Sequence, residues 1–360
     1  MEVAGRFVGI DLGKRTYEMC IVDRKGKISR TGGKTDFAGI DRLCEKLNGD
    51  DAVAIEACNL AFRIERAIRK SVGCKVCIMN AGKLAVIYMS TRKTDKEDSL
   101  KLAKLLKTHD EDELPIVAPP SDEEWERRKL LSEYRSLKCQ RTKEINKLHA
   151  IFEHNGYTQF VRKDMCSEKN RANILPLLKG YEKEEAERLV ERLNLLEKQI
   201  ERLLQKINAE VENDGKIQKV MTVPGIGPIT ALAYVGDVNR FDNAHQVSNF
   251  IGFVPKVDNS CTICRSGHTT KKGNPLLRSL LVQAAWSTVK SKNGGALRDK
   301  YKYMAESRCI GKGKSIVTIA RKLGELLYLI LKTDQEYKPQ KFITPELKIS
   351  KLAEDALECS

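Results

Sequence analysis

A run of seven apolar residues in the second half of the chain constrains the fold more than any other feature of the sequence. The residues recur in steps of three and four, as in a heptad repeat: Leu189, Leu193, Leu196, Ile200, Leu203, Ile207 and Val211. This spacing makes one apolar stripe along a helix, and a second helix has to cover the stripe. A segment that begins after Ser121 carries a comparable set of apolar and aromatic residues: Leu130, Tyr134, Leu137, Ile145, Leu148 and Phe152. The two helices are expected to pack as an antiparallel hairpin, or against helices of partner subunits.

The first 114 residues instead alternate between strand and helix patterns. The segments RFVGIDLG, YEMCIVD and KISRTGGK predict three consecutive strands, and DAVAIEA and CKVCIMN predict two more. Helices are expected from Asp36 to Leu47 and from about Leu60 to Ser71. This order indicates an α/β domain, a mixed sheet with helices on its faces, and by analogy it is the order of an RNase H-like fold.

Acidic residues stand where these strands end. Asp11 closes the first strand and Glu56 closes the fourth, and Asp95 and Asp98 lie three residues apart on one face of a later helix. Four carboxylates brought together repel one another unless divalent cations neutralise them, and such oxygen ligands select Mg²⁺ or Mn²⁺. Two ions of this kind could flank a scissile phosphate. The structural alternative is that Asp95 caps the helix and Asp98 interacts with its dipole.

A turn rich in glycine and proline follows the heptad run. Pro224, Gly225, Gly227 and Pro228 interrupt apolar residues that resume at helical spacing from Ile229, which predicts two short helices joined in a helix-hairpin-helix-like turn. Such a turn presents backbone N–H groups, and these can hold a phosphate without reading a base. Gly225 and Gly227 are therefore candidate nucleic-acid contacts.

The residues after this turn are expected to form a polar loop and then an amphipathic helix from Leu276. The loop holds hydroxyl groups among cations, an arrangement suited to a phosphodiester. Its candidate residues are Ser260, Arg265, Ser266, His268, Lys271 and Lys272, with Arg278 in the helix.

The overall charge favours a polyanionic partner. The formal net charge is +15 with a pI near 9.2, and the basic residues are spread along the whole chain. Nucleic acid is the first expectation and an acidic membrane surface the competitor. No stretch approaches the length of apolar sequence that spans a bilayer, and the N-terminus has no signal-peptide core, so a cytoplasmic protein is expected.

The cysteines suggest reduced thiols. Eleven cysteines are scattered over the chain, and two pairs have Cys-x-x-Cys spacing, namely Cys74 with Cys77 and Cys261 with Cys264. The two pairs together could supply four thiolates to zinc. Ordinary reduced cysteine is favoured, because residues three apart on a strand point to opposite faces.

The chain is expected to have four parts. A proline-rich linker, PIVAPP, follows Leu114. The predicted parts are residues 1–114 as the sheet domain, 115–215 as the helical region, 216–332 as a mainly helical C-terminal domain, and 333–360 as a polar tail. The sequence contains no phosphate-binding loop of the NTPase type, which argues against ATP as an energy source.

In combination, several of these features resemble the insertion-sequence 110 family of transposases, whose relatives include the pilin-inversion recombinase. The resemblance covers about residues 6 to 332 and is carried by the acids in their strand and helix settings, the heptad middle, the PGIGPITA turn and the closing KKGNPLLR. It implies a RuvC-like domain with an Asp-Glu-Asp-Asp site, a coiled-coil insertion, and a C-terminal transposase domain that supplies a nucleophilic serine. By position, the implied catalytic and metal-binding acids are Asp11, Glu56, Asp95 and Asp98.

The implied serine falls on Ser260, counting back from Lys272, Gly273 and Asn274. The family has a glycine after its serine, and here Cys261 takes that place. Ser266, which does precede a glycine, is the alternative, but placing the serine there requires a gap in the alignment. An inactive copy is also possible.

The resemblance further implies how the protein acts. Such enzymes cut and rejoin donor and target DNA through a serine–DNA covalent intermediate with Mg²⁺ or Mn²⁺. A guide non-coding RNA bridges the two DNAs, and the sites are assembled from more than one subunit, so a homo-oligomer, dimer or tetramer, associated with the nucleoid is expected. The sequence leaves two rivals: a RuvC-like metal-dependent junction nuclease that uses water, and a non-catalytic nucleic-acid-binding protein.

Overall fold

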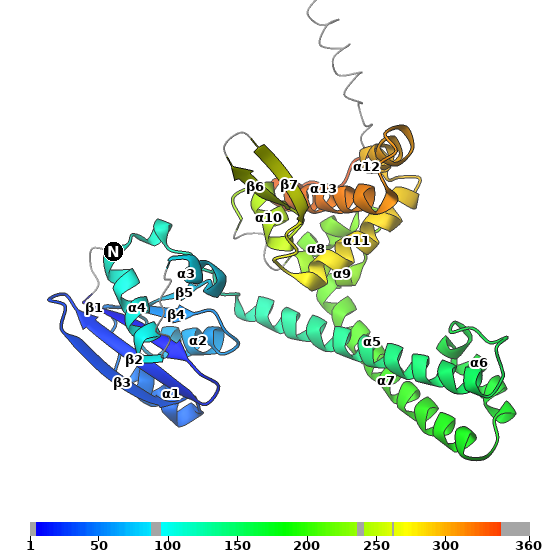
Figure 1. Cartoon of the computed structure of the whole chain (residues 1–360), viewed down its shortest axis with the longest axis horizontal. Coiled ribbons are helices and arrows are strands. Elements are labelled where there is room, and N and C mark those ends of the chain that lie inside the picture. The colour runs from blue at the N-terminus through cyan, green and yellow to red at the C-terminus, as the bar shows by residue number, and fades with distance from the viewer. Residues whose placement is uncertain (1–4, 88–94, 236–240, 261–262, 340–360) are drawn as a thin grey trace, which may run out of the picture. The chain divides into compact units, whose positions relative to one another are not determined.

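A computed structural model describes residues 5–87, 95–235, 241–260 and 263–339 of the chain. The chain forms two compact units, residues 1–121 and residues 122–360 (Figure 1). The helical hairpin and the C-terminal helices belong to the same second unit, and their division into separate domains stays a prediction.

The first unit is built on a five-stranded mixed sheet in the order β3-β2-β1-β4-β5. β1 (Arg6–Leu12) pairs antiparallel with β2 (Thr16–Asp23) and parallel with β4 (Asp51–Glu56). β3 (Ile28–Lys34) is the antiparallel partner of β2, and β5 (Lys75–Met79) is the parallel partner of β4. The predicted strands and the mixed sheet are therefore confirmed, and the parallel neighbours β1 and β4 end at the same edge.

Helices cover both faces of this sheet. On one face α1 (Phe37–Cys44) and α2 (Ala61–Ser71) pack against alternate residues of the central strands, among them Val8, Ile10, Val53 and Ile55. On the other face lies α4 (Asp95–Thr108), with Leu102 and Leu106 against Ala52 and Ala54. A short helix, α3 (Ala81–Ile87), follows β5. α1 begins where the sequence predicts, because the Asp36 carboxylate accepts the Gly39 N–H at 2.8 Å.

The strand geometry decides against a four-thiolate zinc site. Cys74 is buried with the residues that pack on α1 and α2, whereas Cys77 is buried with those that pack on α4. The two thiols thus lie on opposite faces of the sheet and cannot bind one ion. Cys261 lies outside the described residues.

The second unit begins with two long helices, α5 (Asp122–His154) and α7 (Gly180–Glu212), which pack antiparallel within the chain. Ion pairs join them in that sense: Arg127 contacts Glu210 at 3.4 Å, and Arg192 contacts Glu144 at 3.1 Å. The buried residues of α7 include every member of the heptad run. Of the two arrangements left open by the sequence, the hairpin is the one observed.

The distal end of this hairpin is closed by a small cap that contains α6 (Glu168–Ile174). The centre of the cap is Arg171, whose side chain is fully buried. Its guanidinium contacts Glu197 of α7 at 2.7 Å and donates to Asn194 Oδ1 at 3.0 Å and to the Met165 carbonyl at 3.1 Å. Glu197 also pairs with Arg141 of α5, so a single carboxylate ties both hairpin helices to the cap.

The remaining helices form one apolar core around α13 (Lys312–Thr333). They are α8 (Gly215–Met221), α9 (Pro228–Val235), α10 (Ala244–Ile251), α11 (Pro275–Lys290) and α12 (Gly295–Lys302). Leu323 and Leu327 of α13 are fully buried at the centre. The predicted helices 276–290 and 315–331 are thus confirmed.

One prediction about this region is wrong. The expected polar loop is instead a two-stranded antiparallel ribbon, β6 (Pro255–Ser260) with β7 (Ile263–Thr269). Its strands carry mostly polar residues and lack the alternation of apolar residues that identifies a strand in a sequence. Backbone pairing defines these two strands.

Candidate active site

The site begins with two strand ends of the first unit. Asp11 lies near the end of β1 on the same face as Gly9, and Glu56 ends β4 on the same face as Ala54. The face is the one that α4 covers, since a Cβ built on Gly9 would meet α4. The parallel pairing of β1 and β4 therefore places both carboxylates at one edge of the sheet, below the first turn of α4.

Gly9 lets α4 approach that edge. A Cβ at this position would lie 2.0 Å from the Ser99 carbonyl oxygen and 2.6 Å from the Ala103 nitrogen, so no other residue fits without moving the helix. The helix can therefore rest directly on β1, and its first turn brings Asp95 and Asp98 to Asp11. Sequence reasoning missed Gly9. The available signal was a glycine inside an apolar strand, which often marks close approach of another backbone.

The electrostatics confirm that the four acids are neighbours. The pKa of Asp11 is raised from its ordinary 3.8 to about 6, mainly by burial and in addition by the nearby carboxylates Asp95, Asp98 and Glu56. These are the four acids that the sequence picked out. Their role in catalysis stays a prediction, whereas their proximity is a property of the fold.

The four carboxylates are suitable ligands for a hard divalent cation, but their side chains are not arranged as a complete metal-binding site. Carboxylate oxygens around an anionic centre are what Mg²⁺ or Mn²⁺ binds. Among the described residues, however, no group of three His, Cys, Asp or Glu side chains has the spacing to hold an ion. The Asp98 carboxylate instead pairs with the Lys101 amine at 2.8 Å. Lys101 was not anticipated from the sequence.

In the second unit, close packing of the turn between α8 and α9 against α11 explains why residue 225 is a glycine. It has a φ of +92°, and a Cβ there would lie 2.6 Å from the Ala284 carbonyl oxygen of α11. The hydroxyl of Thr288 donates to the Pro224 carbonyl at 2.6 Å and fastens the same turn to the same helix. Gly225 is thus required for this contact, and its role as a phosphate contact stays a prediction.

Gly227 differs from Gly225 in its surroundings. Apart from Gly227 itself and its two neighbours in the sequence, no heavy atom of the described residues lies within 4 Å of a Cβ built on Gly227. The turn between α8 and α9 is therefore open at this glycine, and a phosphate could approach its backbone there.

The ribbon carries the predicted serine. Ser260 is the last residue of β6 and pairs with Ile263, while Ser266 lies within β7 opposite Val257. The side chains of residues 256–266, which include Arg265, lie outside the described part of the structure. Lys271 and Lys272 follow the ribbon and are both exposed.

Arg278 has a structural task. Its guanidinium donates to the Ile251 carbonyl at 2.9 Å and to the Lys271 carbonyl at 3.1 Å. These bonds hold the segment after the ribbon against the end of α10. Arg278 therefore positions the neighbouring lysines, and its role as a direct nucleic-acid contact stays a prediction.

The acids and the ribbon belong to different units of the chain. Asp11, Glu56, Asp95 and Asp98 lie in residues 1–121, whereas Ser260 and the basic residues near it lie in residues 122–360. No helix in the described ranges is both long enough and apolar enough to cross a bilayer.

Comparison with known proteins decides the family. Residues 217–302 match the family described as "Transposase IS116/IS110/IS902 family", and residues 8–154 match a transposase family named for the Asp-Glu-Asp-Asp motif of the same group. The chain belongs to the IS110 family of transposases. It is therefore an enzyme of DNA transposition, and the first match contains Gly227 and Ser260 while the second contains all four acids.

Individual relatives of this transposase have the same character. The transposase for insertion sequence element IS1111A of Coxiella burnetii is 24% identical over 346 residues, which cover 92% of this chain and 91% of the relative. A probable family 20 transposase of Pseudomonas aeruginosa is 36% identical over 105 residues, 28% of this chain and 31% of the relative. The transposase for element IS1328 of Yersinia enterocolitica is 22% identical over 287 residues, 77% of this chain and 82% of the relative.

Proposed function

We propose that this transposase cuts and rejoins DNA through a covalent link between Ser260 and a DNA phosphate, with divalent metal ions held by Asp11, Glu56, Asp95 and Asp98. The observation that carries the proposal is the convergence of these acids on Asp11, in a family that bears their motif in its name. Repulsion within such a cluster of carboxylates destabilises the folded state. A cluster of this kind therefore favours a functional role, such as binding a metal ion.

The reaction is a transesterification. The Ser260 hydroxyl oxygen forms a bond to phosphorus, and the bond from phosphorus to one sugar oxygen breaks. That oxygen leaves as a hydroxyl with the proton that the serine gives up. The phosphoserine link retains the energy of the phosphodiester, so a hydroxyl of another strand can reverse the step and complete the exchange without ATP.

A bound metal would supply what a serine lacks at neutral pH. Mg²⁺ is the ion that this oxygen donor set suits best, and it would activate the hydroxyl and neutralise the phosphate. The chain's own contribution is to hold the four acids at one sheet edge through Gly9 and the close packing of α4 on β1.

The nucleic-acid contacts are expected in the second unit. The open turn at Gly227, in a helix-hairpin-helix-like arrangement, could hold a phosphate, while Arg265, Lys271 and Lys272 add positive charge near the serine. Recognition by a bridging guide RNA fits a basic protein of net charge +15. Because the acids and Ser260 belong to different units, a homo-oligomer could complete each site with parts of two subunits.

Substitution of the serine tests the chemistry. Ser260→Ala should abolish the covalent protein–DNA adduct while DNA and RNA binding persist, and Ser266→Ala is the matched control that should retain the adduct. Adduct formation by Ser260→Ala at the normal level would disprove the assignment. Free 5′-phosphate ends without trapped protein would instead indicate a nuclease that uses water.

A further inference from the structure

The first unit has an exposed aromatic side chain with an arginine on its ring. Phe37 is the first residue of α1, and 79% of its surface is exposed. The Arg63 guanidinium of α2 lies over this ring, 4.5 Å from the ring centroid. An arginine in such a position covers one face of the ring, and the exposed fraction shows that the other face is open to solvent. That face is available for stacking with another flat group.

Three basic residues lie in the segments next to Phe37. Lys14 and Arg15 connect β1 to β2, and Thr35 fastens this connection to the start of α1. The Thr35 backbone N–H donates to the Arg15 carbonyl at 3.0 Å, and its hydroxyl donates to the Lys14 carbonyl at 3.1 Å. Lys34 is the last residue of β3. We name this group of residues the Phe37 corner: Lys14, Arg15, Lys34, Phe37 and Arg63.

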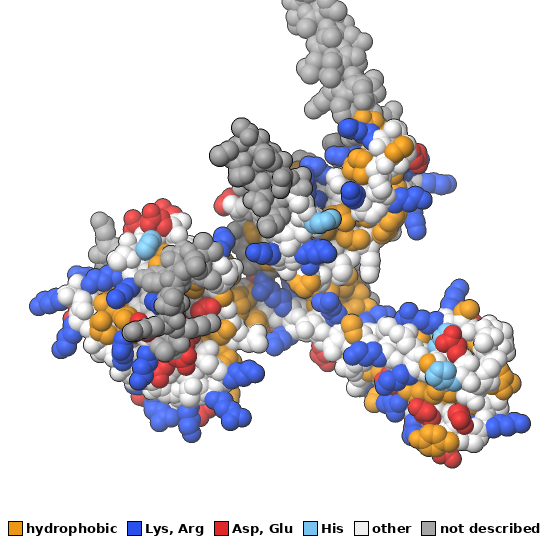
Figure 2. Space-filling model, in the orientation of Figure 1, with side chains coloured by type: hydrophobic (Ala, Val, Ile, Leu, Met, Phe, Trp, Pro, Cys, Tyr) orange, Lys and Arg blue, Asp and Glu red, His pale blue; other side chains and the backbone are white. Residues whose placement is uncertain are grey.

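Positive charge exceeds negative charge at the Phe37 corner. Lys14, Arg15 and Lys34 are exposed, and in the described part of the chain none of them forms an ion pair. The carboxylate within this segment belongs to Asp36, which caps the first turn of α1. The acids of the candidate site lie on the other face of the sheet, under α4. Lysine and arginine side chains are also numerous on the visible face of the first unit (Figure 2).

The neighbouring helices do not cancel this charge. The acids that follow along α1 and α2 each have a basic residue beside them: Asp41 with Arg42, Glu45 with Lys46, and Glu65 with Arg69. The last of these is an ion pair at 3.1 Å, with a buried carboxylate. The surface around the corner is therefore neutral or basic, and the four basic residues of the corner remain available to a polyanion.

An exposed ring by itself does not indicate a binding site, and Tyr181 of α7 illustrates this. It is 67% exposed, and the Arg188 guanidinium lies 5.4 Å from its ring centroid. Arg188 is paired with Glu184 at 3.8 Å. Acidic residues follow this tyrosine along the helix: Glu182, Glu184, Glu185 and Glu187. A polyanion would be repelled at Tyr181, whereas the Phe37 corner would attract it.

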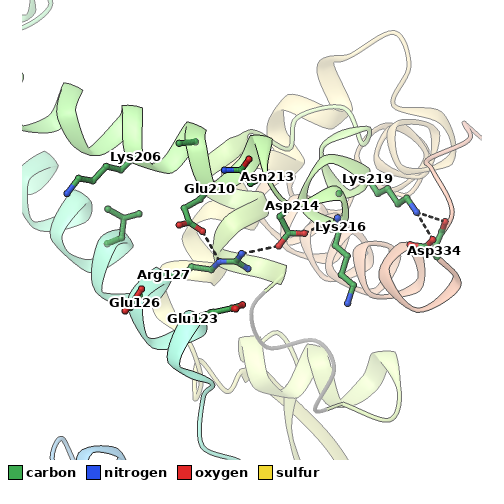
Figure 3. A pocket seen from close by; sticks show the side chains of 13 residues that line it. Glu123, Glu126, Arg127, Lys206, Glu210, Asn213, Asp214, Lys216, Lys219 and Asp334 are labelled. Atoms are coloured by element: carbon green, nitrogen blue, oxygen red, sulfur yellow. Dashed lines mark hydrogen bonds and ion pairs between the residues drawn. The ribbon is translucent and has the colours of Figure 1, made fainter.

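A pocket at the base of the hairpin shows the same contrast for lysines (Figure 3). Arg127 is paired there with both Glu210 and Asp214. The lining of the pocket contains more acidic than basic residues, so its lysines do not make it a site for a polyanion. Lys206 and Lys216 line this pocket and are therefore suitable control positions.

We infer that the Phe37 corner binds single-stranded nucleic acid, with one base on the open face of Phe37 and the adjoining phosphates at Lys14 and Arg15. Single strands are held in this way, by aromatic side chains beside basic residues that contact the backbone. The bases of a duplex are stacked on one another, so a duplex would leave the ring uncovered. Lys14 follows Asp11 by three residues, so a strand held here would continue towards the acids. The inference rests on the proposed function, because it places this strand beside the reacting phosphate.

Photochemical crosslinking tests the inference at the level of one residue. The full-length protein is irradiated with an oligothymidylate or an oligouridylate that carries 5-iodouracil, a base that couples to the aromatic side chains on which it stacks. Peptide mass spectrometry then locates the crosslink. We expect it on the peptide that contains Phe37 and not on the peptide that contains Tyr181, and the stronger of the two arms identifies the strand as DNA or RNA. Absence of a Phe37 crosslink from both arms would overturn the inference.

Substitution of the ring measures its contribution to affinity. Phe37→Ala should weaken binding of the single strand by about fivefold or more, because one stacked base is lost, and Phe37→Trp should restore it. The melting temperature should stay unchanged, since the side chain is exposed. Tyr181→Ala is the matched control and should change affinity by less than about twofold. Unaltered binding by Phe37→Ala, or an equal loss with Tyr181→Ala, would contradict the stacking.

The charge is tested by salt titration of the same binding. In Lys14→Gln/Arg15→Gln the salt dependence of binding should fall by about 0.7 for each lost phosphate contact, whereas Lys206→Gln/Lys216→Gln should leave it unchanged. An equal fall in both variants would overturn the inference. A protein that forms the Ser260 adduct without a Phe37 crosslink would overturn it too, and would leave the proposed function intact. A Phe37 crosslink without the adduct would support the inference and contradict the proposed function.

Discussion

Asp11 is a carboxylic acid whose ionisation is opposed by burial and by the neighbouring acids. Its folded pKa of about 6 stands above the ordinary 3.8, so the folded state holds a proton that the unfolded chain releases. The stabilisation that this proton provides is complete below about pH 4 and is lost as the pH rises to about 6. At neutral pH, without metal, the ionised Asp11 therefore destabilises the fold.

Asp11→Asn should consequently raise the free energy of unfolding at pH 7.5 without metal, by on the order of 1–2 kcal/mol after allowance for solvent screening. At pH 4 the difference should vanish. Denaturant unfolding at the two pH values measures both effects, and Asp41→Asn, an exposed acid of α1, is the control that should show neither. Equal stability of Asp11→Asn and the unaltered protein at pH 7.5 would show that the acids do not strain the fold.

Gly9 is the residue that fixes the distance between α4 and the sheet. Gly9→Val should destabilise the first unit by about 3 kcal/mol or more, because the new side chain meets the backbone of α4. Thermal unfolding followed by circular dichroism measures the change. Gly49→Ala is the control within the same unit, since its Cβ would have no neighbour closer than 3.9 Å. A Gly9→Val variant as stable as the unaltered protein would contradict the described packing.

At the scale of elements, the α8–α9 turn contains two glycines with different tasks. Gly225→Ala should destabilise the second unit, because the residue has a positive φ and its Cβ would meet Ala284. Gly227→Ala should leave the melting temperature nearly unchanged and weaken DNA binding, since the added methyl stands where a phosphate would approach. Melting curves and anisotropy titrations of both variants distinguish the two tasks. The reverse pattern, with Gly227→Ala unstable and Gly225→Ala stable, would refute this division.

The cap of the helical hairpin contains an ion pair between the buried Arg171 and the partly exposed Glu197. Burial acts to raise the pKa of Glu197, but hydrogen bonds from Arg171 and Arg141 outweigh it, so the pKa is lowered overall. A lowered carboxyl pKa stabilises the fold above the ordinary 4.5, and this contribution is lost as the pH falls through the folded value. The cap of the hairpin should therefore loosen in acid.

Glu197→Ala should destabilise the cap by about 3 kcal/mol, because it leaves the Arg171 guanidinium buried without its carboxylate. Hydrogen exchange with mass spectrometry should show faster exchange in residues 157–178, while the core around α13 keeps its protection. Glu201→Ala, an exposed acid one turn further along α7, is the control. Unchanged exchange in the cap would mean that Arg171 is held by its other partners.

Sequence patterns predicted most helices and strands because an element that buries one face has apolar residues at regular intervals. The strands of the sheet, the heptad helix and the helices from 276 and 315 all bury one face, and each was found. The β6–β7 ribbon was missed because its polar strands lack this pattern. The packing role of Gly225 was not predicted for a different reason: a glycine needed for close helix packing looks the same in sequence as one needed for a ligand.

The candidate site shows the same division. Asp11 and Glu56 could be identified because strand ends are visible in sequence and parallel strands end at one edge. Lys101 and Gly9 could not, because their importance arises only when α4 lies against β1. Positions that chain topology determines are thus predictable, whereas those that depend on the packing distance between two elements are not.

On the scale of the whole molecule, the proposed catalytic residues are divided between two units. The acids belong to residues 1–121 and Ser260 to residues 122–360. The proposed chemistry therefore requires one group from each unit.

The most direct test of the account is to trap the protein–DNA adduct in the presence of Mg²⁺, digest both components, and locate the remaining nucleotide by peptide mass spectrometry. We predict a nucleotide joined through its phosphate to the peptide that contains Ser260. This modification should be absent when Asp11 is replaced by Asn. A nucleotide on Ser266 or on any other residue, or cleavage of DNA with no modified peptide, would contradict the account.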